Sequence, residues 1–177
     1  MQFYLQILVL LLLGLVWVHD LRYRAVSWII FPFLFGGIVL LRWVSGETFA
    51  DVWPQFLSNV GLLLIILLLL NLYILVKSRR LVNITKQYIG SGDILFFLVP
   101  ACSLSILNFH FFFLTSLVCT ALIQAVWSTI NKNKKIPLAG LLALFLMLFL
   151  SSDWWFFHQG ITNDNWLLQF YTPWMQN

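Results

Sequence analysis

The sequence predicts an all-α polytopic membrane protein with six transmembrane helices, and two observations lead to this fold class. Of the 177 residues, 62% are hydrophobic and only 9% are charged, whereas a water-soluble domain carries about 25% charged residues. Short polar breaks divide the hydrophobic sequence into segments, and at roughly 20 residues per span the length allows about six helices. We therefore expect lipid to surround most of the chain.

The hydrophobic segments give the expected helices. No Lys or Arg precedes the first apolar run and no small-residue cleavage site follows it, so we expect a retained helix there and not a secretory signal. The apolar stretch from Ile94 to Ile130 would be about 55 Å long as one helix, so we place a turn at Asn108-Phe109-His110, which leaves a short fourth span. The expected spans are 2–18, 25–44, 55–76, 94–107, 110–130 and 136–152.

The basic residues predict the orientation. All of the ten Lys and Arg except Arg42 fall in alternate breaks, which must share one side of the membrane. The positive-inside rule makes that side cytoplasmic and places both termini on the extracytoplasmic side. We divide the chain into a six-helix membrane core over 1–152 and an extracytoplasmic interfacial tail over 153–177.

This orientation separates the six acidic residues into two groups. Only Asp20 and Asp93 belong to the cytoplasmic side, each where a loop meets a span, and a carboxylate at a membrane boundary is by default a functional-site hypothesis. Two carboxylates that face each other tend to share one proton near neutrality. In that state the ionised member can draw a proton from water while the protonated member polarises a scissile carbonyl. The other acids are Glu47, Asp51, Asp153 and Asp164.

Three small residues, Gly90, Ser91 and Gly92, directly precede Asp93. Glycine permits backbone dihedrals and close approaches that other residues forbid, so an extended substrate strand could pass beside the acid. We assign these three residues to substrate binding. The structural alternatives are an interfacial ion pair for Asp20, with a neighbouring arginine, and a helix N-cap for Asp93.

Other chemistry-bearing residues do not form a competing cluster. His19, His110 and His158 are scattered along the chain, and Cys102 and Cys119 lie in apolar stretches where we expect them to be buried hydrophobic residues. We therefore expect no metal and no cofactor. Orientation and anionic lipid headgroups account for the basic loops, so the expected partner of these loops is the bilayer and not a nucleic acid.

The two aspartate segments resemble those of a known family. Gly90-Ser91-Gly92-Asp93 resembles the GxGD motif of intramembrane aspartyl proteases, and the Arg-rich segment 20–26 resembles the first aspartate motif of the type IV prepilin peptidases. Segment 86–89 is similar to the basic residue and spacer that precede GxGD in that family. Segment 135–138 is similar to the start of one of the family's late helices. The resemblance covers about residues 10–145.

The resemblance implies a six-helix peptidase of the bacterial inner (cytoplasmic) membrane. Its catalytic pair would be Asp20 and Asp93, and it would remove the basic leader of a pilin-like or pseudopilin precursor just before the precursor's hydrophobic helix, without a metal. The chain differs from the family pattern at Val26-Ser27-Trp28, where Ile-Pro-Asn is usual, and at Leu95, where Lys is usual. It also lacks the cysteine-rich cytoplasmic segment of many members, so methylation of the new N-terminus is not expected.

Two other classes stay open from the sequence. A small ion or proton-coupled membrane carrier would use the same acids as a relay, and a non-catalytic peptidase-like scaffold would tolerate the loss of both. The sequence leaves the identity of the precursor, the separation of the two carboxylates and the oligomeric state open.

Overall fold

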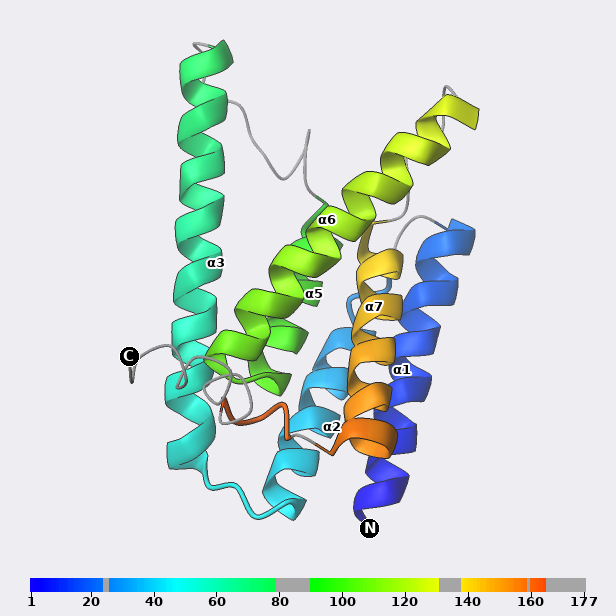
Figure 1. The fold of residues 1–177 in the computed structure, drawn as a ribbon, viewed down its shortest axis with the longest axis vertical. Helices are drawn as coiled ribbons and strands as arrows, with labels where there is room; N and C mark the ends of the chain where they lie inside the picture. Colours follow the sequence, from blue (N-terminus) through cyan, green and yellow to red (C-terminus); the bar gives the residue numbers. More distant parts are fainter. Residues whose placement is uncertain (24–25, 79–89, 131–137, 159, 165–177) are drawn as a thin grey trace, which may run out of the picture.

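The computed structural model describes residues 1–23, 26–78, 90–130, 138–158 and 160–164. Over these residues the fold is all-helical (Figure 1). The helices are α1 (Gln2–Tyr23), α2 (Ile30–Val44), α3 (Phe49–Ser78), α5 (Ser91–Ser103), α6 (Ile106–Ile130), α7 (Leu138–Ser152) and the π-helical turn η1 (Asp153–Phe157).

Four stretches of helix among the described residues are long and apolar enough to cross a membrane. The two remaining helices are shorter: α2 has 15 residues and α5 has 13, which is about 22 and 20 Å against a hydrocarbon core of about 30 Å. The short fourth span expected from the sequence corresponds to α5. The long apolar stretches are Gln2–Tyr23, Phe49–Lys77, Ile106–Trp127 and Leu138–Phe157, the last of which joins α7 to η1.

The core lies where α1, α2, α5 and α7 pack together. Helix α1 packs mainly against α7 and α2, and the short α5 contacts α2, α3 and α7. On α1 the fully buried residues Val9, Leu13 and Val16 follow helical spacing, as do Leu142 and Leu146 on α7. The outer face of α3 carries a row of exposed leucines together with Ile65, an apolar surface that suits contact with lipid.

The turn between the fourth and fifth spans lies earlier than the sequence suggests. Helix α5 ends at Ser103 and α6 begins at Ile106, so the prediction of a turn at Asn108-Phe109-His110 is wrong. Ser105 directly precedes α6, and its carbonyl accepts the Phe109 N–H at 2.8 Å. The Asp164 carboxylate, far along the chain, accepts the Ser105 hydroxyl at 2.5 Å and the Leu107 N–H at 3.1 Å. This gives the Leu107 N–H, in the first turn of α6, the hydrogen-bond partner that the helix itself does not supply.

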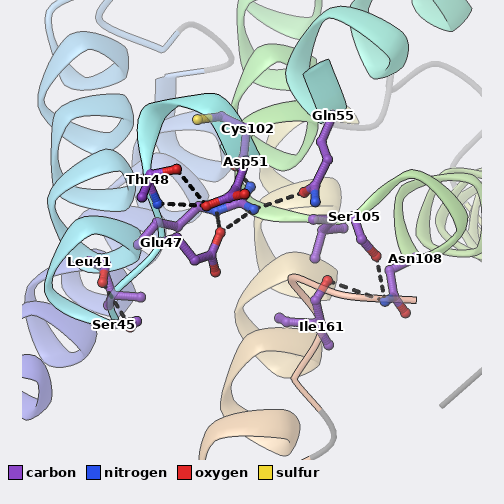
Figure 2. Close-up of polar contacts among 12 residues, drawn as sticks. Leu41, Ser45, Glu47, Thr48, Asp51, Gln55, Cys102, Ser105, Asn108 and Ile161 are labelled. Carbon is purple, nitrogen blue, oxygen red and sulfur yellow. Dashed lines mark hydrogen bonds and ion pairs between the residues drawn. The ribbon is translucent and has the colours of Figure 1, made fainter. Parts of the chain in front are cut away.

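The same end of the bundle holds the described part of the predicted tail. The buried Asn108 amide donates to the Ile161 carbonyl at 3.2 Å (Figure 2) and to the Asn163 carbonyl at 3.0 Å. The buried Asp153 carboxylate accepts the Gly160 N–H at 3.1 Å. Residues up to Asp164 are therefore packed onto the helices, while residues 165–177 lie outside the described part of the chain.

Arg42, the one basic residue that breaks the alternation, is buried at this end with 1% of its surface exposed. Its Nε donates to Glu47 at 2.7 Å, its Nη2 to the Gln55 side chain at 2.8 Å, and its Nη1 to the Cys102 carbonyl at 2.8 Å. Figure 2 shows Glu47, Gln55 and Cys102 gathered around this point. Arg42 therefore links α2, α3 and α5 and is not a charge that orients the chain in the membrane.

Removing Arg42 is expected to destabilise the fold. Arg42→Met leaves Glu47 and the Cys102 carbonyl without their donor, and breaking a buried ion pair costs about 3 kcal/mol at the lower end of the usual range. Thermal unfolding in detergent micelles should show a lower midpoint. Lys77→Met is the matched control, since Lys77 is exposed at the other end of α3 and its contact among the described residues is with the Tyr73 ring. Equal stability of Arg42→Met and wild type would contradict a structural role for the cluster.

Candidate active site

Asp20 lies at the end of the bundle opposite to Arg42, three residues before the end of α1. Its side chain is only 6% exposed, and its Oδ2 accepts the backbone N–H of Gly140 at 2.5 Å. Gly140 has no side chain at a place where even a methyl group would be crowded. A Cβ there would lie 3.0 Å from the Asp20 Cβ and 3.3 Å from the Trp17 carbonyl oxygen. The glycine therefore allows α1 and α7 to approach closely enough for this hydrogen bond.

Asp93 is the third residue of α5 and closes its first turn. Its Oδ2 accepts the Gly90 N–H at 3.1 Å, and the Gly90 carbonyl accepts the Asp93 N–H at 3.1 Å. Asp93 therefore helps to cap α5 from its third position, whereas the alternative from the sequence made Asp93 the N-cap, a position that Gly90 holds. The carboxylate also interacts with the backbone N–H of Ala139 and lies within electrostatic range of Asp20.

The two aspartates converge on the first turn of α7. The N–H groups there, those of Ala139 and Gly140, meet the carboxylates of Asp93 and Asp20 respectively. The first N–H groups of a helix have no partner within the helix and form its positive end, so they attract anions. Two carboxylates from helices that are distant in sequence are thereby brought to one helix terminus, within electrostatic range of each other.

The structure gives no support to an ion pair as the role of Asp20. Among the residues that the structure describes, the ion pair found is Arg42–Glu47, and the Arg22 guanidinium lies over the Tyr23 ring at 5.5 Å from its centroid. Arg24, the other candidate partner, falls outside the described residues. The contact that holds Asp20 is the amide of α7.

The glycines before Asp93 differ from expectation in one respect. Gly90 has φ −64° and ψ 146°, which any residue can adopt, and Gly92 lies inside α5 with open space where a Cβ would be. Special backbone dihedrals are therefore not needed here. Gly90 is constrained by space, because a Cβ would lie 3.2 Å from the Asp93 Oδ2. Ser91, which lies between the two glycines in the sequence, is the first residue of α5.

The remaining candidates take no part in this group. The His19 ring packs on Tyr23, and the His110 ring bonds to the Ile106 carbonyl at 2.7 Å. Cys102 is buried, as expected, whereas Cys119 is only half-buried. Across the described ranges, no three His, Cys, Asp or Glu side chains gather as a metal site. The segments 86–89 and 135–137, which carry part of the family resemblance, lie outside the described residues.

Comparisons of the chain with protein-family models, with curated proteins and with solved structures return no match.

Gly140→Ala tests the packing that places Asp20. The added methyl group is expected to push α1 away from α7 and to lower the free energy of unfolding by about 1–3 kcal/mol, the usual cost of overpacking. Gly14→Ala on α1 is the matched control, because a Cβ there meets nothing within 4 Å; its effect should stay within about 1 kcal/mol. The measurement is thermal unfolding in micelles. A Gly140→Ala protein as stable as the Gly14→Ala protein would show that this contact is not tight.

Proposed function

We propose that this chain is a membrane-embedded aspartic endopeptidase of the prepilin-peptidase kind, with Asp20 and Asp93 as its catalytic pair. The single observation that supports this most is the convergence of the two carboxylates on consecutive N–H groups of α7. An ordinary helix cap requires one carboxylate at one terminus. A second buried carboxylate at the same terminus adds electrostatic repulsion, which a purely structural design would avoid.

The arrangement suits hydrolysis by a shared proton. Asp20 is buried behind the site, and Asp93 is half-buried at the start of α5, where Gly90 is exposed. In the proposed mechanism the ionised member of the pair takes a proton from water. The water oxygen attacks the scissile carbonyl, which the protonated member polarises by a hydrogen bond. Collapse of the tetrahedral intermediate breaks the C–N bond and returns a proton to the leaving amine.

The substrate class comes from the family resemblance. We propose a pilin-like or pseudopilin precursor whose basic leader is removed at the cytoplasmic face of the bacterial inner membrane. A bond just before an apolar helix suits a site at one end of an apolar bundle, since the helix can remain in lipid while the leader stays in water. Gly90, Ser91 and Gly92 would lie along the substrate strand, and no metal takes part.

Asparagine substitutions test the catalytic pair. Asp20→Asn and Asp93→Asn keep the size of the side chain. The amide oxygen of asparagine can still accept the backbone hydrogen bond, but the side chain cannot ionise. Each is expected to reduce leader removal from a co-expressed precursor at least about 100-fold, because general acid–base catalysis is lost. Precursor and product are separated by gel electrophoresis.

Asp51→Asn is the matched control for capping. Asp51 is exposed and accepts the Thr48 N–H at 2.9 Å at the start of α3, as Asp93 accepts that of Gly90. Its substitution should leave cleavage unchanged. Persistent leader removal in either Asp20→Asn or Asp93→Asn would refute the paired mechanism, and pH-dependent ion flux without cleavage would favour the carrier.

The pH dependence of cleavage follows from the shared proton. The active pair carries one proton, so the rate should fall at low pH, where both carboxyl groups are protonated, and at high pH, where both are ionised. The kcat/KM of the purified protein on a leader-bearing precursor should therefore pass through a maximum. A rate that rises steadily with pH across the stability range would point to a single base instead.

A further inference from the structure

Helix α3 lies at the edge of the bundle (Figure 1). It packs on α5 and α6, and its buried residues Asn59 and Leu63 belong to the side that faces them. On the far side of the helix, residues spaced alternately four and three apart form one straight stripe. We call this stripe the α3 seam, which consists of Leu57, Gly61, Leu64, Leu68, Asn71 and Leu75.

The described residues of the chain leave the α3 seam largely uncovered. Leu57, Leu64 and Leu68 are 51%, 61% and 59% exposed. From its first to its last residue the seam runs about 27 Å, close to the thickness of about 30 Å of a hydrocarbon core. A repeat of 3.5 residues is the spacing at which two helices stay in contact along their length. Exposed leucines alone would suit lipid equally well, so the two seam residues that are not leucine distinguish lipid from a second helix.

Asn71 brings a polar amide into this apolar surface. Its side chain is exposed and has no hydrogen-bond partner among the residues that the structure describes. Lys77, the nearest charged residue along α3, is six residues away, which is about 9 Å. Lipid chains neither donate nor accept hydrogen bonds, so an amide at such a depth is stabilised by a partner on another helix.

Gly61 is the second unusual residue of the seam. A Cβ at this position would meet nothing within 4 Å, so packing within the chain does not require a glycine here. Glycine is also among the weakest helix formers, and Gly61 lies in the interior of a helix of 30 residues. In membrane helices, a glycine on an exposed face allows a second helix to approach closely.

The chemistry of the α3 seam fits a second copy of this chain. Copies that insert into one membrane share an orientation, so a two-fold axis along the membrane normal brings each seam residue to the same residue of the other copy. Asn71 then faces Asn71, and one amide is complementary to another because each has N–H donors and a carbonyl acceptor. Gly61 faces Gly61 on the same axis, where the two backbones can approach. Any other partner would need its own polar group at the depth of Asn71.

We propose that the chain forms a parallel homodimer through the α3 seam, with a hydrogen bond between the two Asn71 side chains. The two α3 helices cross with a left-handed angle of about 20°, as is usual for a repeat of this period in membranes. The interface involves neither Asp20 nor Asp93, so the dimer does not depend on the proposed function.

Disulfide crosslinking in liposomes tests the position of the interface. Leu68→Cys places a thiol on the α3 seam, and Leu69→Cys is the matched control outside it, because the two leucines are 59% and 58% exposed. Both are made in a Cys119→Ser background, which removes the half-buried native thiol. A disulfide needs Cα atoms within about 7 Å of each other, so oxidation should link two Leu68→Cys chains and leave Leu69→Cys chains unlinked. Equal linkage at the two positions would contradict the seam.

Dilution in lipid measures the contribution of the amide. Donor-labelled and acceptor-labelled chains are reconstituted together, and energy transfer is followed as the ratio of lipid to protein rises. Asn71→Leu should weaken self-association at least about threefold, the effect of one hydrogen bond between membrane helices, whereas Asn71→Gln keeps an amide and should retain most of the affinity. Gln124→Leu removes an exposed amide from α6 instead and should leave self-association unchanged.

Gly61→Leu separates dimerisation from folding. The chain has room for the added side chain, so thermal unfolding of the diluted protein should be unchanged, while energy transfer falls because the partner helix is held away. A chain that stays monomeric at every lipid ratio would overturn the proposal, as would a dimer that neither Asn71→Leu nor Gly61→Leu weakens. A dimer that Gln124→Leu disrupts and Asn71→Leu does not would also overturn it, since its interface would lie on α6.

Discussion

The contact between the Asp20 carboxylate and the Gly140 N–H determines how this end of the molecule is built. It requires α1 and α7 to approach so closely that a Cβ at position 140 would lie only 3.0 Å from the Asp20 Cβ. Once α7 is fixed in this way, its adjacent Ala139 N–H faces the start of α5, where Asp93 lies. The pairing of the two aspartates thus depends on one glycine at the first turn of a third helix.

Both ends of the bundle follow the same physical requirement. Away from water, helix termini leave N–H and C=O groups that need partners from within the protein. At one end Arg42 binds the carbonyl of Cys102 near the last turn of α5, and Asp164 accepts the Leu107 N–H and the Ser105 hydroxyl at the start of α6. At the other end Asp20 and Asp93 accept N–H groups at the starts of α7 and α5. Charged residues are few in this chain, and those at helix ends largely serve this purpose.

The sequence predicts the helical class, the approximate helix positions and the short α5, because hydrophobic runs and polar breaks are local features. It places the turn after α5 wrongly, because asparagine is common in turns and Asn108 interrupts a long apolar stretch. In the structure this side chain is buried, with partners at Ile161 and Asn163. Those partners are more than 50 residues away, and a local pattern carries no information about them. The same applies to Gly140, which no motif marks and whose importance depends on a neighbour 120 residues distant.

The unequal lengths of the helices have a consequence for the supply of water. Helix α3 has 30 residues, or about 45 Å, while α5 beside it has 13. A bilayer responds to such hydrophobic mismatch by thinning next to the shorter element and by tilt of the longer one. In a bilayer, headgroups and water would then reach deeper beside α5 and the similarly short α2 than beside α3. Under the proposed function, the start of α5 would be hydrated from the nearby membrane surface, and hydrolysis at Asp93 would draw its water from there.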